Sequence, residues 1–282
     1  MPHYFLRECD VMIFTPDDDF NLDKIAKSGQ CFRWEKIDKG YRILYLDKSL
    51  IVYERENNFE ILADEEEFNS VWRNYFDLSE NYKKIREKID DNDEFLKKAA
   101  DFEKGIRILR QDPFETLISF IISQNKNIPA IEKSIFLLSK YCGEEKKDVL
   151  GETYYAFAIP ERIASADDDI LTSCKLGYRV PYVKRAAISY LNGEIDFDVL
   201  KVMDSDIAIK ELQKLYGVGL KVASCISLFG LHHLNAFPKD VWVKRILDEF
   251  YKDGYPYEKY SPYNGVYQQY MFAYYRKIAG AS

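Results

Sequence analysis

The sequence has few of the residues that build metal sites and disulfide frameworks. Its 282 residues include five cysteines, no two of them in Cys-x-x-Cys spacing, and three histidines, two of which are adjacent. Scattered cysteines in odd number argue against a disulfide framework, a zinc site and an iron–sulfur cluster. We therefore expect no metal and no organic cofactor.

Long apolar runs are also absent. No stretch approaches the roughly 20 apolar residues that a membrane span needs, and the first residues, MPHYFLRECD, have no apolar core of signal-peptide length. The hydrophobic content of 47% and the charged content of 31% are those of a soluble globular protein. The sequence therefore predicts a cytoplasmic protein without a membrane partner.

Positive charge is scarce for a protein that would bind nucleic acid, since the formal net charge is −7. The excess of negative charge is concentrated in one segment of the chain. Residues 56–103 hold fifteen Asp and Glu against seven Lys and Arg, whereas residues 170–192 hold four basic residues and no acid. The net charge alone therefore does not exclude a nucleic-acid partner.

The first part of the chain has the pattern of a β-sheet. From Tyr4 to about Leu62, apolar and polar residues alternate in short runs broken by turn residues, which predicts several antiparallel strands. A helix from Asn21 to about Lys27 is expected within this stretch. Acidic residues are candidate caps at its start, and Gly29 is its stop.

From Glu65 onward the hydrophobic period is helical. One helix begins with Asp112 as cap and Pro113 in its first turn, and its apolar middle predicts burial. Further helices are expected at about 160–168, 181–192, 204–215, 221–229, 240–251 and 262–279. We predict an α+β fold: an N-terminal β-sheet lobe with acidic helices in residues 1–112, packed on a mostly α-helical body in residues 113–282.

The segment DSDIAIKELQKLYGVGLKVASCISLF, residues 204–229, predicts a helix, a tight turn and a second helix. Gly217 and Gly219 permit backbone angles that other residues resist. With Val218 between them, they are expected to expose N–H groups that suit a phosphate. This pattern indicates a helix-hairpin-helix, which grips the DNA backbone without recognising its sequence. The alternative is a plain turn between two helices.

Lys221 stands where the second helix begins, in a field that disfavours its charged form. A neutral lysine is a nucleophile, and at C1′ of a nucleotide it could displace the base and form a Schiff base with the opened sugar. The alternative is a lysine that only contacts phosphate. Asp240, nineteen residues later, begins the next helix. It is either only a cap or also a carboxylate that stabilises positive charge on the sugar as the base departs.

Six separated segments carry a resemblance to a known family. SGQCFRW, ILRQDPFETLISFIISQNKNI, LGYRVPYV, GVGLKVASCI, PKDVW and SPYNGVYQQYMF resemble, in this order, the 8-oxoguanine DNA glycosylases of the helix-hairpin-helix (HhH-GPD) superfamily. The resemblance runs from about residue 20 to 275. It implies base excision repair: the enzyme flips 8-oxoguanine out of double-stranded DNA, cleaves its N-glycosidic bond with Lys221 as nucleophile and Asp240 as catalytic carboxylate, and nicks the strand by β-elimination. We expect a monomer, associated with the nucleoid if the source is bacterial.

The resemblance also implies a base pocket. The Gly29 carbonyl would accept the N7 hydrogen that distinguishes 8-oxoguanine from guanine. Cys225 and Phe272 would stack on the two faces of the flipped base, and Gln268 would bond its Watson–Crick edge. Without the resemblance, Cys225 and Phe272 would be core residues and Gly29 only a helix stop.

Other residues would act on the duplex. By resemblance, Asn125 enters the gap left by the flipped base, and Tyr178 and Arg179 wedge the stack and contact the orphaned base. Two positions depart from the family. Ala130 stands where eukaryotic members carry an arginine, which leaves opposite-base selectivity open. Trp242 stands where a histidine is frequent, which leaves one contact to the phosphate or to the aspartate open.

Two other functions remain possible. One is a helix-hairpin-helix glycosylase for a different damaged base, such as alkylated adenine; enzymes of that kind generally lack the hairpin lysine. The other is a non-catalytic helix-hairpin-helix DNA-binding protein, which would need neither Lys221 nor Asp240 and should carry more positive charge.

Overall fold

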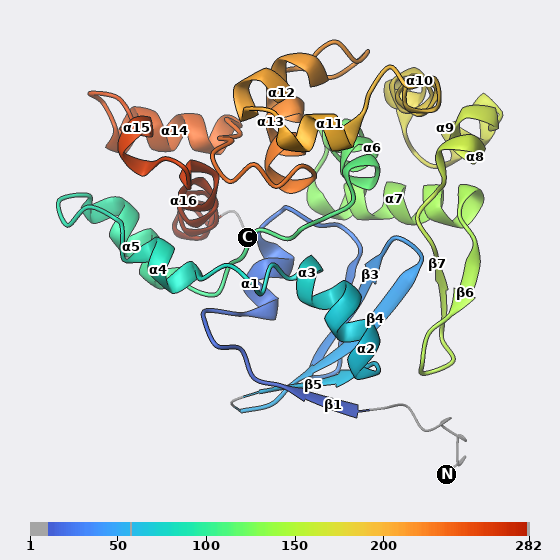
Figure 1. Ribbon diagram of the computed structural model, residues 1–282. Coiled ribbons are helices and arrows are strands. Elements are labelled where there is room, and N and C mark those ends of the chain that lie inside the picture. The colour runs from blue at the N-terminus through green and yellow to red at the C-terminus, as the bar shows by residue number, and fades with distance from the viewer. Residues whose placement is uncertain (1–10, 57, 281–282) are drawn as a thin grey trace.

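The computed structural model describes residues 11–56 and 58–280, so the part of the expected sheet from Tyr4 to residue 10 lies outside the described residues. Figure 1 shows a sheet at the bottom of the view and most of the helices above it. Five antiparallel strands form the sheet in the order β1-β5-β4-β3-β2. They are β1 (Val11–Phe14), β2 (Trp34–Ile37), β3 (Gly40–Tyr45), β4 (Lys48–Glu54) and β5 (Phe59–Leu62). The predicted antiparallel sheet is confirmed.

The core of the sheet lobe lies on one face of the strands. Ile43 pairs with Leu50 across β3 and β4, and both side chains are fully buried. They pack in one cluster with Trp72 and with the apolar side of helix α1 (Leu22–Lys27). The pleat sends alternate residues to opposite faces, so this register fixes which strand residues reach that core.

The predicted helix α1 is confirmed, but its cap is not acidic. The Asn21 side chain accepts a hydrogen bond from the Lys24 N–H at 2.9 Å and so caps the helix. Asp18, one of the acidic residues that precede the helix, instead accepts from the Lys83 N–H at 2.9 Å. Gly29 follows the last turn with φ of +78°, as expected of a helix stop in the left-handed region.

The acidic segment forms short helices rather than long ones. They are α2 (Glu65–Glu67), a π-helical turn (Phe68–Trp72), α3 (Arg73–Tyr75), α4 (Tyr82–Arg86) and α5 (Glu94–Phe102). The buried side of α5, with Leu96 and Ala99, packs in the core cluster of the helical body and against α16 (Asn264–Ile278). The boundary between lobe and body at residue 112 stays a prediction.

Helices make up most of the rest of the chain. They are α6 (Pro113–Ser123), α7 (Ile128–Cys142), α8 (Pro160–Ser165), α9 (Asp168–Ser173), a 3-10 turn (Gly177–Arg179), α10 (Val180–Leu191), α11 (Phe197–Val202), α12 (Ser205–Leu212), α13 (Leu220–Phe229), α14 (Val241–Phe250), α15 (Tyr257–Tyr260) and α16. The sequence did not predict the hairpin of β6 (Glu145–Lys147) and β7 (Thr153–Tyr155), whose strands are too short to show a hydrophobic period. None of the described helices is long and apolar enough to cross a membrane.

Helix α6 is the central support of the body. The Asp112 side chain caps it by accepting from the Glu115 N–H at 2.8 Å, and nearly every residue from Pro113 to Ile122 is buried, as predicted. The Glu115 carboxylate pairs with Arg33 of the sheet lobe at 2.9 Å, and both side chains are largely buried. This ion pair fastens the lobe to the helix whose far end leads to Asn125.

Candidate active site

The predicted helix-hairpin-helix is formed by α12 and α13. Gly217 has φ of +84°, and a side chain there would overlap the ring of Tyr182, so both conformation and space require glycine. Gly219 has an ordinary φ of −87°, contrary to the prediction. Open space surrounds the position of its missing side chain, so another molecule can approach the backbone there.

Val218 was predicted to expose its N–H to a phosphate, but in the structure this N–H is already bonded within the turn. It donates to the Leu215 carbonyl at 3.1 Å, and the side chain is buried, so Val218 anchors the turn. The N–H groups of the first turn of α13 lack intrahelical partners by helix geometry. A phosphate would therefore bind at Gly219 and the start of α13 rather than at Val218.

Lys221 is the second residue of α13 and is half-buried. Its Nζ lies 5.2 Å from the centre of the Phe120 ring, which comes from α6. Phe120 is itself stacked on Phe229 at the far end of α13, with 5.5 Å between ring centres. Sequence reasoning missed Phe120, because nothing in an apolar helix distinguishes the one ring that supports the lysine.

Lys221, Cys225 and Asp240 share one neighbourhood. Burial raises the pKa of the Cys225 thiol, Lys221 lowers it and Asp240 raises it, and such effects require nearby charges. The thiol is therefore neutral near pH 7. A neutral, buried sulfur suits contact with a base better than nucleophilic attack.

Asp240 caps α14, which is one of the two roles that the sequence suggested for it. Its Oδ1 accepts from the Trp242 N–H at 2.9 Å and from the Val243 N–H at 2.8 Å. Both bonds go to one oxygen, and Oδ2 has no hydrogen-bond partner among the described residues. The two capping bonds thus orient the carboxylate through Oδ1 and do not involve Oδ2.

The structure also brings Gly29 to Phe272, from opposite ends of the chain. A side-chain carbon built on Gly29 would lie 3.6 Å from Phe272 Cε1. The Arg276 guanidinium lies over the Phe272 ring, 5.3 Å from its centre. Gln268 is buried one turn before Phe272, and its Oε1 accepts from Gln269 at 3.0 Å. That these residues form one base pocket with Cys225 stays a prediction.

Asn125 and Tyr178 are exposed and lie together, as the predicted gap-filling role needs. The Asn125 Nδ2 donates to Tyr178 Oη at 3.0 Å, and Asn125 has φ of +51°. Tyr178 is 52% exposed. A hydrogen-bonded pair of polar and aromatic side chains therefore lies at the surface, between the end of α6 and the turn that precedes α10.

Arg179 is buried, and its predicted contact with the orphaned base stays a prediction. It is 5% exposed, and its Nε donates to the Gln124 carbonyl at 2.9 Å and its Nη1 to the Leu176 carbonyl at 3.0 Å. Backbone carbonyls thus accept bonds from three of its five N–H donors. Gln124 was missed: its Nε2 donates to the Gly217 carbonyl at 3.0 Å and so ties this loop to the hairpin.

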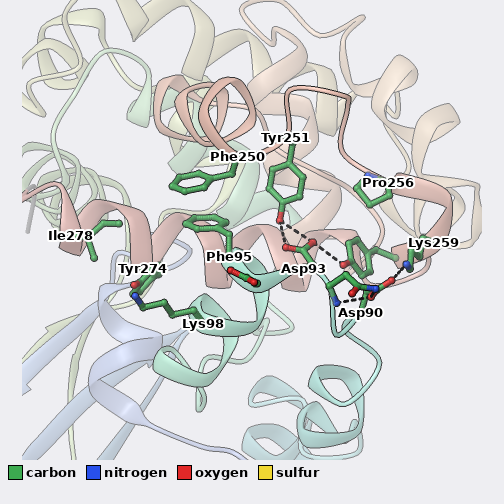
Figure 2. Close-up of a pocket in the computed structure, with 13 residues that line it drawn as sticks. Asp90, Asp93, Phe95, Lys98, Phe250, Tyr251, Pro256, Lys259, Tyr274 and Ile278 are labelled. Atoms are coloured by element: carbon green, nitrogen blue, oxygen red, sulfur yellow. Dashed lines mark hydrogen bonds and ion pairs between the residues drawn. The ribbon is translucent and has the colours of Figure 1, made fainter.

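Two of the cavities differ in the charge of the residues that line them. A cavity of about 710 Å³ opens beside Lys221, and its lining includes the exposed lysines Lys210, Lys239 and Lys244. Such a cluster attracts phosphates despite the net charge of −7. The other, of about 730 Å³, lies where α5, α14 and α16 meet (Figure 2) and holds none of the predicted site residues.

The second cavity is a structural junction. Asp93 accepts from Tyr251 at 3.0 Å, as Figure 2 shows, and it also accepts from Tyr260 at 2.7 Å. Phe95 stacks on Phe250 beside it, with 3.8 Å between ring centres. As for metals, residues 11–56 and 58–280 contain no group of three or more His, Cys, Asp or Glu that could hold an ion.

Comparison with known proteins identifies the family. The profile of the 8-oxoguanine DNA glycosylase N-terminal domain matches residues 12–117. A probable N-glycosylase/DNA lyase of Methanothermobacter thermautotrophicus is 30% identical over 274 residues, covering 84% of each chain. The DNA-free 8-oxoguanine glycosylase/lyase of Clostridium acetobutylicum is 37% identical and superposes with a TM-score of 0.88 over 94% of this chain and 96% of that one. The chain belongs to the 8-oxoguanine DNA glycosylase family.

The family, the α+β fold and the enzyme class, N-glycosylase/DNA lyase, are thus as predicted. The Clostridium enzyme has also been solved with double-stranded DNA that contains cytosine opposite 8-oxoguanine; it is 36% identical, with a TM-score of 0.87 over 95% of this chain and 98% of that one. The likeness thus extends to a DNA-bound form of a family member.

The two departures from the family pattern have clear places in the structure. Ala130 is exposed in the first turn of α7, where its N–H donates to Asn127 at 3.0 Å. Trp242 supports Asp240 through its backbone N–H only. Its ring lies 4.9 Å from the Arg245 guanidinium, so the side chain packs away from the cap.

Proposed function

We propose that the chain excises 8-oxoguanine from double-stranded DNA and then nicks the strand, without a metal or organic cofactor. One observation carries the proposal: Lys221, in the first turn of a hairpin helix, and Asp240, which caps the next helix, both influence the pKa of the buried Cys225, in a member of the 8-oxoguanine DNA glycosylase family. The direct test is a duplex with a single 8-oxoguanine, in which release of the base and strand cleavage are followed separately.

In this mechanism the Lys221 amine attacks C1′ of the flipped nucleotide, and the base departs with the bonding electrons of the glycosidic bond. The Asp240 carboxylate stabilises the positive charge that develops on the sugar. Ring opening gives a Schiff base between Lys221 and C1′. Loss of a C2′ proton then expels the 3′ phosphate by β-elimination and cuts the strand.

The lesion is distinguished from guanine at N7. In 8-oxoguanine N7 carries a hydrogen that the Gly29 carbonyl can accept, whereas N7 of guanine is itself an acceptor. Two facing acceptors repel each other, and a buried acceptor without a donor is costly. One correctly placed carbonyl therefore favours the lesion over the normal base.

Enlarging either pocket residue should reduce excision. Gly29→Val adds strain at a φ of +78° and places methyl groups against Phe272, and Cys225→Ile crowds a buried site. We expect each to lower the single-turnover excision rate by about tenfold or more, with binding to an abasic-site analogue retained. Gly151→Val is the matched control, because Gly151 has φ of +81° and open space around it. Equal loss of excision and binding would indicate misfolding instead.

The DNA partner would be held by the hairpin and by the lysines beside Lys221, with Asn125 and Tyr178 supporting the duplex where the nucleotide leaves. We further propose that the protein acts as a monomer in the cytoplasm, or at the nucleoid if bacterial. Sedimentation of the protein with and without an oligonucleotide duplex tests the monomer.

Selectivity for the base opposite the lesion should be relaxed. A bidentate arginine contact supplies roughly 1–3 kcal/mol of discrimination, but Ala130 cannot hydrogen-bond through its side chain, and Arg179 is engaged by carbonyls. We expect similar single-turnover excision rates from four duplexes that differ only in the opposite base. Ala130→Arg should raise the preference for cytosine by about tenfold, and Ala130→Met should not. A strong cytosine preference in the unmodified protein would mean that Arg179 is released on binding and acts alone.

A further inference from the structure

Gln30, the residue after Gly29, is buried and fully bonded. It is 1% exposed. Its Oε1 accepts from the Leu109 N–H at 2.8 Å, and its Nε2 donates to the Arg107 carbonyl at 2.8 Å. The same Nε2 donates to Ser28 Oγ at 2.8 Å. The side chain therefore ties both sides of Gly29 to residues 107–111, the segment that leads into α6.

This segment also reaches the helix that carries Lys221. The Gln111 side chain donates to the Gln30 carbonyl at 2.8 Å, and the Gln111 N–H donates to the carbonyl of Phe229 at 3.4 Å. Phe229 is the last residue of α13. Hydrogen bonds through residues 107–111 thus connect the turn at Gly29 to the helix that carries Lys221.

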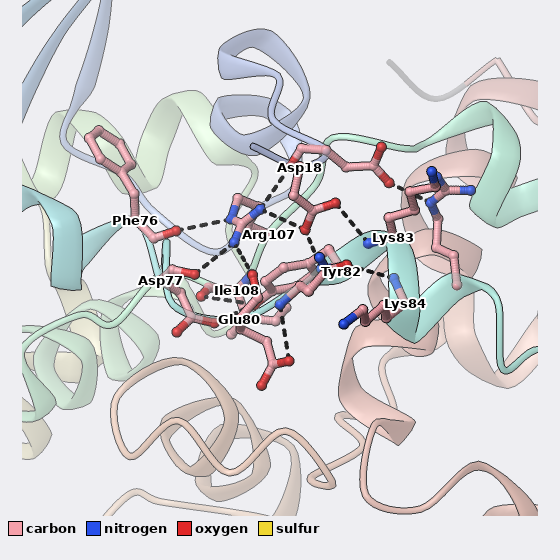
Figure 3. A network of polar contacts seen from close by, with 12 residues as sticks. Asp18, Phe76, Asp77, Glu80, Tyr82, Lys83, Lys84, Arg107 and Ile108 are labelled. Atoms are coloured by element: carbon pink, nitrogen blue, oxygen red, sulfur yellow. Dashed lines mark hydrogen bonds and ion pairs between the residues drawn. The ribbon is translucent and has the colours of Figure 1, made fainter. Parts of the chain in front are cut away.

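The segment itself is held rigidly. Figure 3 shows the buried Arg107 guanidinium surrounded by acceptors. It donates to the carbonyls of Phe76 at 3.1 Å, Asp77 at 2.7 Å and Glu80 at 2.7 Å. It also lies over the ring of Tyr82, 4.3 Å from its centre. Because all these partners are backbone or buried groups, the Arg107 carbonyl that Gln30 contacts has little freedom to move.

The turn needs such support, because a glycine does not fix its own conformation. The φ of +78° at Gly29 is one of several angles that glycine adopts easily. The direction of its carbonyl is therefore set by the neighbours on either side, and a hydrogen bond weakens steeply when its geometry is lost. We propose that Gln30 is a positioning residue, which aims the Gly29 carbonyl at N7 of the lesion. The proposal rests on the proposed function.

The test compares two steps that differ in their need for Gly29. Excision of 8-oxoguanine uses the carbonyl, whereas β-elimination at a preformed abasic site involves no base. Gln30→Glu keeps the shape but turns an oxygen toward the Arg107 carbonyl, and Gln30→Met keeps the volume but removes all polar contacts. We expect either change to lower single-turnover excision by about tenfold to a hundredfold, with abasic-site cleavage changed by less than about twofold. Ser28→Ala, which removes one contact of Gln30, should give a smaller loss of the same kind.

Tyr154→Phe is the matched control. It deletes one hydrogen bond, from Tyr154 Oη to the Asp47 carbonyl at 2.8 Å, which involves none of the residues Ser28, Gly29 and Gln30. It should leave both steps unchanged. Wild-type excision in a folded Gln30 variant, or a proportional loss of both steps, would overturn the proposal. If the Gln30 variants do not fold, Ser28→Ala decides by the same criterion. Failure of the unmodified protein to excise 8-oxoguanine would instead overturn the proposed function.

Discussion

Replacing Lys221 with glutamine should abolish base excision while leaving the binding of damaged duplex nearly unchanged. The amide cannot attack C1′, so neither the Schiff base nor β-elimination can follow. We expect a loss in single-turnover excision on the order of a thousandfold or more. Binding should persist because the hairpin turn depends on Gly217 and on backbone groups of α13 rather than on this side chain. The measurement pairs a single-turnover rate with a titration of labelled duplex.

Lys210→Gln serves as the control for this change. Lys210 lines the same cavity as Lys221 but is exposed on α12. Losing its charge should weaken DNA binding slightly and leave the rate at saturating enzyme intact. Full excision by the Lys221→Gln protein would refute the assignment of the nucleophile.

Asp240→Asn should slow excision strongly and change stability little. Asparagine is as good a helix cap as aspartate, so the bonds to the N–H groups of Trp242 and Val243 can be kept. The negative charge that stabilises the sugar cation is lost, which costs roughly a hundredfold in rate. Single-turnover excision and thermal unfolding of the same protein separate the two roles.

The matched control is Asp196→Asn. Asp196 caps α11 in the same way, with one oxygen accepting from two N–H groups at 3.0 and 3.1 Å. It should alter neither excision nor melting temperature appreciably. A fall in melting temperature of Asp240→Asn together with intact excision would mean that Asp240 is only a cap.

Local sequence signals predicted the elements on which the site stands. Asp112 and Pro113 marked the start of α6, and Gly217 marked the hairpin turn, because caps and left-handed turns depend on a few neighbouring residues. The cap of α1 was assigned wrongly for a tertiary reason. Asp18 instead accepts a hydrogen bond from the Lys83 N–H, which lies 65 residues further along the chain.

Other features of the site also depend on partners that are distant in the sequence. Arg179 lies in a basic stretch and looks exposed in sequence, but the carbonyl of Gln124 holds it in the interior. Phe120 and Gln30 carry no local signal of their roles, since one is an apolar residue in an apolar helix and the other a polar residue in a buried turn. Contacts of this kind follow from packing between segments, which no short pattern encodes.

The most direct test of the account is borohydride trapping on a duplex with a single 8-oxoguanine. Reduction of the Schiff base makes the bond between enzyme and DNA permanent. We predict one covalent band, at one protein per duplex, with the DNA attached to Lys221 in the digested complex and no band from the Lys221→Gln protein. Base release without any trapped complex, or attachment to a different residue with full trapping by Lys221→Gln, would contradict the account.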